Sequence, residues 1–176
     1  MACPVIRIAH NLIVSNNISM RSRTSETPDP RWLELDRQLC FALYSSSLAM
    51  TKLYKPMLEP LGLTYPQYLA MLVLWQQDGL TVSQVGERLQ LDSGTLTPLL
   101  KRLEAAGLLR RERDTADERR VLLKLTQAGR GLRRRALSIP EQIACASACS
   151  LDEIAELTQR LQQLRDQLTA ALPLAA

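Results

Sequence analysis

Apolar positions in the middle of the chain recur at the spacing of two short helices joined by a tight turn. Thr81 and Gln84 predict a reciprocal cap at the start of the first helix. Asp92 or Ser93 is expected to cap the second helix, and Gly107 to end it. The leucines expected to form the buried stripe of the second helix are Leu96, Leu99, Leu100 and Leu103. This pattern predicts a helix-turn-helix, whose second helix can enter a DNA major groove.

Two short strands are predicted directly after these helices, at residues 108–113 and 121–125, with the polar loop 114–118 between them. A basic hairpin beside a recognition helix is typical of a wing that reaches into the narrow, negative minor groove. A solvated charged hairpin without a ligand is the alternative. The arginines in and around the hairpin are Arg110, Arg111, Arg113, Arg119, Arg120 and Arg130. With two correctly spaced helices before it, the hairpin predicts DNA binding.

The outward face of the second helix supplies the predicted DNA contacts. Hydroxyl groups near the helix start are expected to reach base edges, whereas Lys101 and Arg102 suit phosphates. Pro98 inside a helix costs about 3 kcal/mol, which favours a role in fitting the groove. The residues predicted to contact DNA are Ser93, Thr95, Thr97, Pro98, Lys101 and Arg102 on this helix, with Arg113, Asp117, Arg119 and Arg120 in the wing.

Long amphipathic helices are predicted on either side of this region. One begins at an Asp29 cap and runs to about Lys55, before Pro56. The other follows a capping box of Ser150 and Glu153. Its apolar residues step by three and four, which matches a heptad seam and indicates a second subunit; packing within one chain is the alternative. These seam residues are Ile154, Leu157, Leu161, Leu164, Leu168 and Leu172.

The predicted fold is mainly α with a small β-wing (α+β), a winged helix-turn-helix domain plus N- and C-terminal dimerisation helices. The domain is expected over residues 31–176, with DNA binding in 64–126 and dimerisation in 31–58 and 127–172. Residues 1–30 look like a disordered or mis-assigned extension. Within it we expect Met20 to be the true start, which makes 1–19 a translation-start error.

Composition narrows the functional class. The net charge is only +4, but most of the arginine lies in residues 101–135, which points to a polyanionic partner. No apolar run approaches the roughly 20 residues that span a bilayer, so no membrane partner is expected. Four cysteines without an export signal indicate a reducing cytoplasm. One histidine among scattered cysteines predicts no metal site, and no cofactor is expected.

The segment RRERDTADERRVLLKLT after the helix-turn-helix resembles the wing of the MarR family of winged-helix dimeric regulators. Asp117 and Arg119 match its Asp-x-Arg wing signature, in which the aspartate braces the arginine in the minor groove. The segment DSGTLTPLLKRLE is similar to the organic hydroperoxide-sensing OhrR subgroup. The resemblance covers residues 33–172 and implies a homodimeric repressor that binds a palindromic DNA operator and has an organic hydroperoxide as its inducer.

The same resemblance assigns a redox sensor. On spacing alone, Cys40, with Tyr44 one helical turn away, is better explained as a small buried hydrophobe. In the OhrR subgroup, however, the sensing cysteine is followed by tyrosines at the separations of Tyr54 and Tyr65. Fourteen helical residues span about 21 Å, so these phenols must come from the second subunit. Phenol hydrogen bonds favour a thiolate, which a peroxide oxidises to sulfenic acid.

The resemblance to the two-cysteine OhrR type also implies a resolving cysteine near the C-terminus of the other subunit. Cys145 matches that position best, and Cys149 is the alternative. Two other functions stay open. One is a MarR-type repressor that responds to a small aromatic ligand, with Cys40 structural. The other is a thiol peroxidase, which we do not favour because the chain has no peroxidase loop, so no enzyme is expected.

Overall fold

The structure is a computed structural model that describes residues 29–172 apart from 115, 116 and 118. The expectations for residues 1–28, including the alternative start at Met20, therefore lie outside the described residues. The chain divides into two units, residues 1–48 and 49–176. Within the described part, no helix is long and apolar enough to cross a membrane.

The described part of the first unit starts with two short 3-10 helices, Pro30–Leu33 and Leu35–Arg37, before helix α1 (Leu39–Leu58) begins. Asp29 does cap the first turn, since its Oδ1 accepts from the Arg31 amide at 3.0 Å. The prediction of one helix from Pro30 was nevertheless wrong. Glu34 and Gln38 adopt extended backbone angles, with ψ of 132° and 115°, and each interrupts the helical path.

The predicted end of this helix was also slightly early. Pro56 lies inside α1, which continues to Leu58 before the 3-10 helix Glu59–Leu61. A proline in the last turn removes only one of the final hydrogen bonds, so the helix can run on briefly. Gly62 then turns the chain with φ of +67°, a left-handed conformation that glycine adopts without steric cost.

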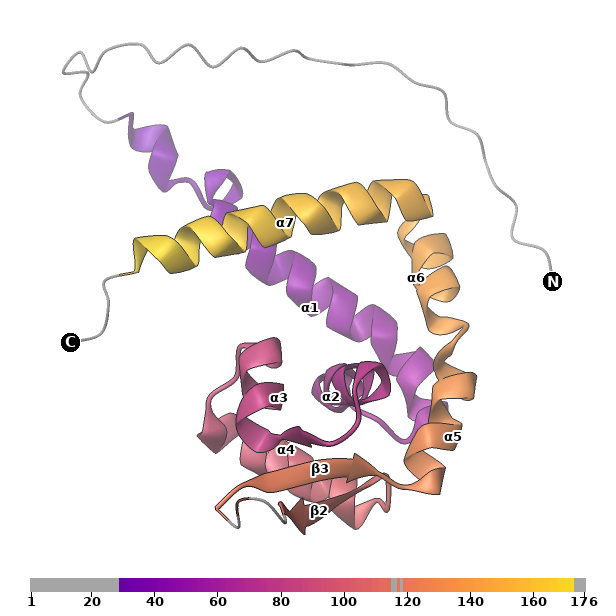
Figure 1. The fold of residues 1–176 in the computed structure, drawn as a ribbon. Helices are drawn as coiled ribbons and strands as arrows, with labels where there is room; N and C mark the ends of the chain where they lie inside the picture. Colours follow the sequence, from indigo (N-terminus) through magenta and orange to yellow (C-terminus); the bar gives the residue numbers. More distant parts are fainter. Residues whose placement is uncertain (1–28, 115–116, 118, 173–176) are drawn as a thin grey trace. The chain divides into compact units, whose positions relative to one another are not determined.

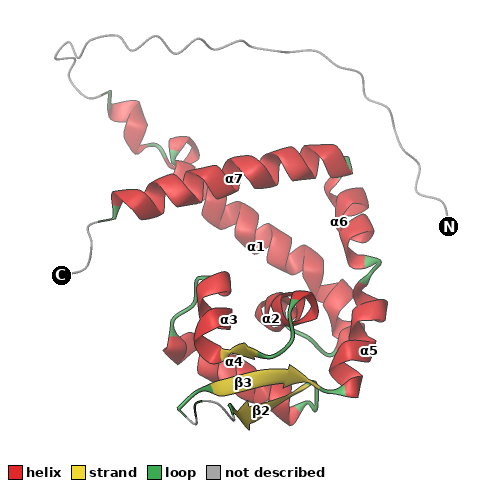
Figure 2. Ribbon diagram, viewed as in Figure 1, coloured by secondary structure: helices red, strands yellow, loops and turns green. Residues whose placement is uncertain are grey.

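Three helices form the centre of the second unit: α2 (Tyr65–Gln76), α3 (Val82–Leu89) and α4 (Ser93–Ala105) (Figures 1 and 2). Thr81 caps α3 as predicted, because the Gln84 amide donates to its Oγ1 at 3.2 Å and its own amide donates to Gln84 Oε1 at 2.9 Å. Asp92, rather than Ser93, caps α4. Gly107 follows that helix with φ of +70°.

The leucine stripe of α4 forms the core between the helices and the sheet. Leu96, Leu99, Leu100 and Leu103 are all buried, as predicted. Burial of such side chains contributes about 1.5–3 kcal/mol each, so the stripe fixes α4 on the domain. The α2 residues that are buried in the same core are Tyr68, Ala70, Met71, Val73 and Leu74.

A three-stranded antiparallel sheet completes the winged part, with the order β1–β3–β2. The strands β2 (Leu109–Arg113) and β3 (Val121–Leu125) form the predicted hairpin, with Arg111 paired to Leu123. Strand β1 (Leu80–Thr81) was not predicted. Two residues are too short to show an alternating pattern, and β1 pairs with β3 about forty positions later in the chain.

Three helices follow the sheet: α5 (Gln127–Ala136), α6 (Ile139–Ser147) and α7 (Leu151–Ala171). Thr126 caps α5, and Ser150 caps α7 as predicted. Ala148 ends α6 in the left-handed region with φ of 54°. Of the seam residues, Ile154 and Leu164 are half-buried and the remaining four are exposed, so α7 has no fully buried side chain.

The start of α5 is fixed to the winged part by contacts between residues far apart in sequence. Trp75 Nε1 donates to the Gly129 carbonyl at 2.8 Å, and Thr126 Oγ1 donates to the Gly107 carbonyl at 2.6 Å. Asp78 accepts from the Leu125 amide at 2.8 Å and pairs with Arg130 at 2.5 Å. Helix α5 is therefore held to α2, to the end of α4 and to β3 at one joint.

We predict that Gly129→Ala destabilises the protein by about 2 kcal/mol. A Cβ at this position would lie 2.0 Å from the Leu108 carbonyl oxygen, a backbone atom that cannot move aside cheaply. Gly131→Ala is the matched control, because nothing lies within 4 Å of its added Cβ; it should stabilise by about 0.5–1 kcal/mol. Urea unfolding measures the free energy of unfolding of both variants. Equal values would contradict the close packing of Gly129 against Leu108 at this joint.

Candidate functional site

The outward face of α4 presents the residues predicted to contact DNA. Ser93, Thr95, Pro98, Lys101 and Arg102 are exposed, opposite the buried leucines. Thr97 differs, because it is only partly exposed and its carbonyl accepts from Arg111 Nη2 at 3.4 Å. The hydroxyls and Pro98 occupy the first half of the helix and the cations the second half. This arrangement suits base contacts at the helix start and phosphate contacts further along.

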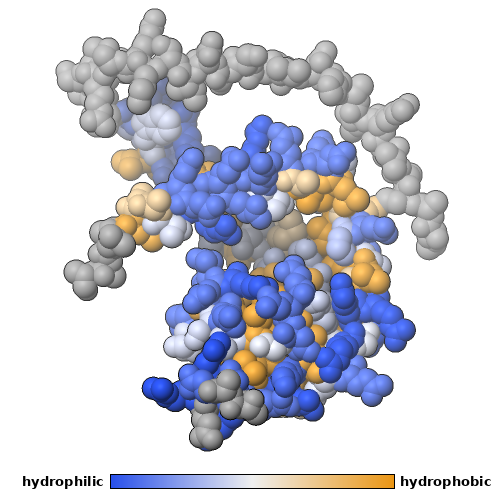
Figure 3. Space-filling model, viewed as in Figure 1, coloured by the Kyte–Doolittle hydropathy of each residue, from blue (hydrophilic) through white to orange (hydrophobic). Residues whose placement is uncertain are grey.

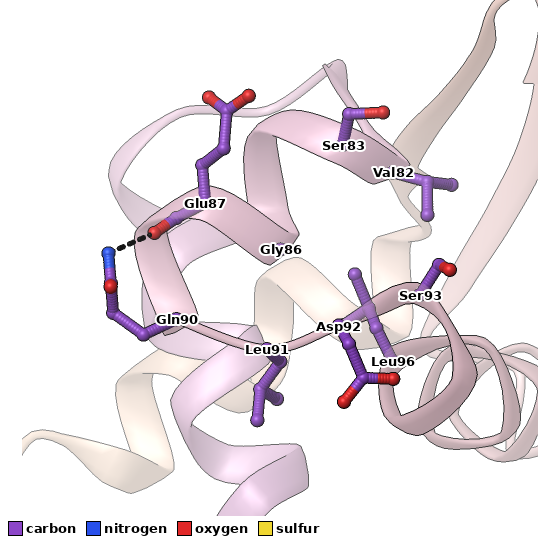
Figure 4. A pocket seen from close by; sticks show the side chains of 9 residues that line it. All are labelled: Val82, Ser83, Gly86, Glu87, Gln90, Leu91, Asp92, Ser93 and Leu96. Atoms are coloured by element: carbon purple, nitrogen blue, oxygen red, sulfur yellow. Dashed lines mark hydrogen bonds between the residues drawn. The ribbon is translucent and has the colours of Figure 1, made fainter. Parts of the chain in front are cut away.

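A tight turn joins α3 to α4. Gln90 ends α3 in the left-handed region, with φ of 55°. Gly86 permits a close approach, since a Cβ there would lie 3.0 Å from the Leu91 carbonyl oxygen. A groove runs between the two helices beside this turn (Figure 4). Its lining residues are Val82, Ser83, Gly86, Glu87, Gln90, Leu91, Asp92, Ser93 and Leu96.

The wing carries its basic residues near the turn of the hairpin. Asp117 Oδ1 accepts from the Arg119 amide at 3.1 Å and lies 3.5 Å from Arg119 Nε, while the Arg119 side chain is 95% exposed. Arg113 is exposed, and Arg120 Nε lies 3.9 Å from Asp114 Oδ2. The aspartate thus braces an arginine that projects outward. Such a guanidinium can enter the narrow minor groove.

Two of the six arginines around the hairpin serve the fold instead. Arg111 is fixed to α4, because its amide donates to Glu104 Oε1 at 3.1 Å and its Nε lies 3.4 Å from Glu104 Oε2. Arg130 pairs with Asp78 at the joint described above. These two arginines were counted with the basic hairpin but were not among the residues predicted to contact DNA. Glu104 and Asp78 were missed, because their partners are not set by local helical spacing.

A cluster of tyrosines lies where the end of α1 meets α2. The rings of Tyr54 and Tyr65 have centroids 4.8 Å apart, and that of Tyr68 lies 5.9 Å from Tyr54. Burial, with the neighbouring phenols Tyr65 and Tyr68, raises the pKa of Tyr54 to about 12. Burial also raises the pKa of Tyr65. Both phenols are therefore neutral hydrogen-bond donors at physiological pH. Tyr68 was not predicted to join them.

The thiol predicted to be the sensor is free and exposed. Cys40 lies in the first turn of α1, and Tyr54 lies near the end of the same helix. Tyr44, one turn after Cys40, is 61% exposed. Thus the structure brings Tyr54 and Tyr65 together, while the helix itself separates Cys40 from Tyr54 by fourteen residues.

The other two described cysteines lie around the junction of α6 and α7. Cys145 is on α6 and is disulfide-bonded in this structure. Cys149 follows the left-handed Ala148 and is a free, exposed thiol. Among the residues that the structure describes, no group of His, Cys, Asp and Glu side chains is arranged to hold a metal ion.

Comparison with protein families places the winged part among transcription regulators. The family model described as "Transcriptional regulator SarA/Rot" matches residues 52–135. The "Organic hydroperoxide resistance transcriptional regulator" of Bacillus subtilis is 50% identical over 136 residues, which cover 77% of this chain and 92% of that protein.

Solved structures agree with the sequence comparison. Reduced AbfR bound to DNA superimposes with a TM-score of 0.64 and 36% identity, covering 77% of this chain and 94% of that one; AbfR comes from Staphylococcus epidermidis. Its disulfide-formed structure matches with a TM-score of 0.53 and 35% identity, over 77% and 90% of the two chains.

The Streptomyces coelicolor transcriptional regulator PcaV, in complex with its natural ligand, matches with a TM-score of 0.67 and 30% identity, over 76% of this chain and 96% of that one. Fold and sequence thus lead to one family. The chain belongs to the MarR family of winged-helix, DNA-binding transcriptional regulators.

Proposed function

We propose that this protein is a homodimeric repressor of organic hydroperoxide resistance, released from a palindromic operator when Cys40 is oxidised. The observation that carries the proposal is the pairing of Tyr54 and Tyr65, 4.8 Å apart in one protomer, while the free thiol of Cys40 is held far along the same helix. The two phenols then serve the Cys40 of the partner subunit. The Bacillus subtilis relative, an organic hydroperoxide resistance regulator, supports this inducer.

Neutral phenols suit this role. Tyr54 and Tyr65 keep their protons at physiological pH, so each can donate a hydrogen bond to a sulfur anion. Hydrogen bonds to the charged form favour the thiolate, which is the reactive species. Tyr44, on the thiol's own helix, adds a third phenol. The site thus favours a nucleophilic sulfur without a metal or cofactor.

The proposed reaction has two steps. The Cys40 thiolate attacks one oxygen of the hydroperoxide, so that an S–O bond forms, the O–O bond breaks, and the leaving alkoxide takes a proton to become an alcohol. The resulting sulfenic acid condenses with a thiol of the partner subunit, giving a disulfide and water. The resemblance to two-cysteine regulators favours Cys145 for this thiol, once the disulfide that it forms in this structure has been reduced, and Cys149 is the alternative.

Exposed apolar side chains support the dimer. Within the described residues, the large exposed hydrophobics lie in residues 32–50 and 137–172. The described winged part between these segments has none. Figure 3 shows hydrophobic residues around α6 and at the two ends of α7, whereas hydrophilic residues cover the middle of α7 and much of the winged part. We therefore assign dimerisation to residues 31–58 and 127–172, and DNA binding to 64–126.

The joint at the start of α5 suggests how oxidation reaches DNA. Because α5 is bonded to α2, β3 and the end of α4, the winged part moves with α5 as one body. A disulfide formed near the α6–α7 junction would displace α5 and turn both winged parts together. Two recognition helices fit half-sites about 34 Å apart, so rotation removes them from successive major grooves.

Two broader assignments follow from the family. The relatives are transcriptional regulators, and a regulator needs one oxidation per event rather than repeated turnover, so we assign no enzymatic activity. A DNA-binding regulator acts where the chromosome is, so we propose that the protein is cytoplasmic.

A second candidate is a repressor that responds to a small aromatic ligand, with Cys40 structural. The observation that favours it is a pocket beside Tyr65, whose lining includes apolar Leu58 and Leu63 and the cations Lys52 and Lys55, which outnumber its one carboxylate, Glu59. Such a lining suits an aromatic acid. The complex of PcaV with its natural ligand gives a precedent in the family.

Replacing the sulfur separates these two candidates. We predict that cumene hydroperoxide lowers the operator affinity of the wild-type protein about tenfold or more, and that Cys40→Ser abolishes the response because no sulfenic acid can form. The measurement is a gel-shift titration with reduced protein on DNA upstream of its own gene. A Cys40→Ser protein that is still released by hydroperoxide would contradict the sensor assignment.

Removing the phenol hydroxyls tests the activation of the thiol. In Tyr54→Phe/Tyr65→Phe, iodoacetamide should alkylate Cys40 about tenfold more slowly at pH 7, with the midpoint of the pH–rate profile moved upward by about one unit. The midpoint moves upward because the loss of the two phenol donors disfavours the Cys40 thiolate. Tyr68→Phe is the matched control, since this ring is only 4% exposed. Identical profiles for the double variant and the control would refute the role of the phenols.

The second thiol is tested by cross-linking. After reduction with a dithiol and then addition of hydroperoxide, the wild-type protein should migrate as a covalent dimer on a non-reducing gel. Cys145→Ser should lose this band, because the Cys40 sulfenic acid then has no partner, while Cys149→Ser should keep it. A covalent dimer that persists in Cys145→Ser/Cys149→Ser would exclude both cysteines.

A further inference from the structure

The cap of the recognition helix uses both hydrogen-bond donors of Thr95. The Thr95 amide donates to Asp92 Oδ1 at 2.9 Å, and its hydroxyl donates to Asp92 Oδ2 at 2.8 Å. A carboxylate can only accept, so the direction of the second bond is fixed. Bonds from the Thr95 amide and hydroxyl hold the pKa of Asp92 below its ordinary value, which keeps it ionised at neutral pH.

A threonine hydroxyl has one proton and two lone pairs. With its proton committed to Asp92, the exposed Thr95 hydroxyl can only accept a hydrogen bond from DNA. Without this carboxylate, the hydroxyl could rotate and either donate or accept. Asp92 therefore sets the polarity of a side chain on the face of α4 that is turned outward.

Two residues beside this pair, Gly94 and Pro98, are compatible with that polarity. Gly94 leaves room for the carboxylate, since a Cβ there would lie 3.0 Å from Asp92 Oδ1. Pro98 is exposed one turn later and has neither a side-chain donor nor an amide hydrogen. Thr95 and Pro98 thus form a small surface that accepts hydrogen bonds or makes apolar contact, but donates nothing.

The bases differ in what they offer such a surface. In the major groove adenine and cytosine present an amino donor, thymine presents a methyl group, and guanine presents two acceptors. A hydroxyl that can only accept forms a hydrogen bond with the amino group of adenine or cytosine. At guanine it faces two acceptors and forms no hydrogen bond. An exposed proline ring suits the thymine methyl group.

We propose that Asp92 is a specificity-determining residue: by holding the Thr95 proton, it makes α4 select an adenine or cytosine amino group, next to a thymine methyl group contacted by Pro98. This inference rests on the proposed function, because it needs α4 in the major groove. Asp92 acts through Thr95 and is a positioning residue. Its own negative charge opposes phosphate and so lowers affinity for every sequence.

Asp92→Asn is the decisive variant. Asparagine caps a helix about as well as aspartate, so the fold should be kept, which a thermal unfolding curve checks. Its amide nitrogen can donate to the Thr95 hydroxyl, which turns the threonine proton outward. Glu87→Gln is the matched control, because Glu87 lines the same groove and the change also removes one negative charge without touching Thr95.

The DNA probe is a duplex that the reduced, full-length wild-type protein selects from a random library. Dissociation constants are measured on this duplex and on copies changed at one base, with purine for adenine, pyrimidin-2-one for cytosine, and deoxyuridine for thymine. For the wild-type protein, loss of one amino group in each half-site should weaken binding about tenfold. Loss of an adjacent thymine methyl group should weaken it for the wild-type protein but not for Pro98→Ala.

Asp92→Asn should bind all duplexes more tightly, yet its ratio between the selected duplex and the copy lacking that amino group should fall toward one. Glu87→Gln should keep the wild-type ratio. An unchanged ratio in Asp92→Asn, with binding intact, overturns this inference alone. Selection of no duplex at all overturns the proposed DNA-binding function and this inference with it.

Discussion

An α-helix rises 1.5 Å per residue, and this single constraint shapes the proposed sensor. Helix α1 carries Cys40 in its first turn and Tyr54 near its end, so its rise keeps the thiol and this phenol about 21 Å apart along the axis. The phenols instead gather with each other, Tyr54 against Tyr65. In the proposed sensor, a site made of the Cys40 thiol and these phenols would therefore need two chains, and its redox chemistry would be a property of the dimer.

The winged part that binds DNA is joined to α5 by polar contacts between residues far apart in sequence. Buried leucines fix α4 in a core to which α5 contributes Leu132 and Ala136, and a few polar groups at the start of α5 add directional bonds. The Trp75 indole, the Asp78 carboxylate and the Thr126 hydroxyl each bond backbone that is distant in sequence. Such bonds are directional, and in the proposed mechanism they pass a displacement of α5 to α4 and the wing.

Local features of this fold were predictable from sequence, and long-range ones were not. The caps at Thr81 and Ser150 and the leucine stripe of α4 depend on residues within a few helical turns, and the structure confirms them. Strand β1 and the Asp78–Arg130 pair depend on partners about forty to fifty positions away, which no local pattern reveals. The break of the first helix near Glu34 was missed because the apolar spacing continues through it.

The candidate site also has features that the sequence predicts and features that only the structure reveals. The outward face of α4 follows from helical periodicity, and Asp117 beside Arg119 follows from the family's wing signature. The bond from the Thr95 hydroxyl to Asp92 could not be predicted from sequence. An aspartate that caps a helix with one oxygen gives the same sequence pattern whether or not its second oxygen also accepts a hydrogen bond. The addition of Tyr68 to the tyrosine cluster likewise emerges only when α1 and α2 are packed together.

The most direct test of the account is a mixed dimer of a Cys40→Ser subunit and a Tyr54→Phe/Tyr65→Phe subunit. If phenols serve the partner's thiol, the one remaining Cys40 faces intact tyrosines, and its rate of oxidation by hydroperoxide equals that of a wild-type site. Oxidation as slow as in the Tyr54→Phe/Tyr65→Phe homodimer would contradict the account, because the phenols would then act within their own chain.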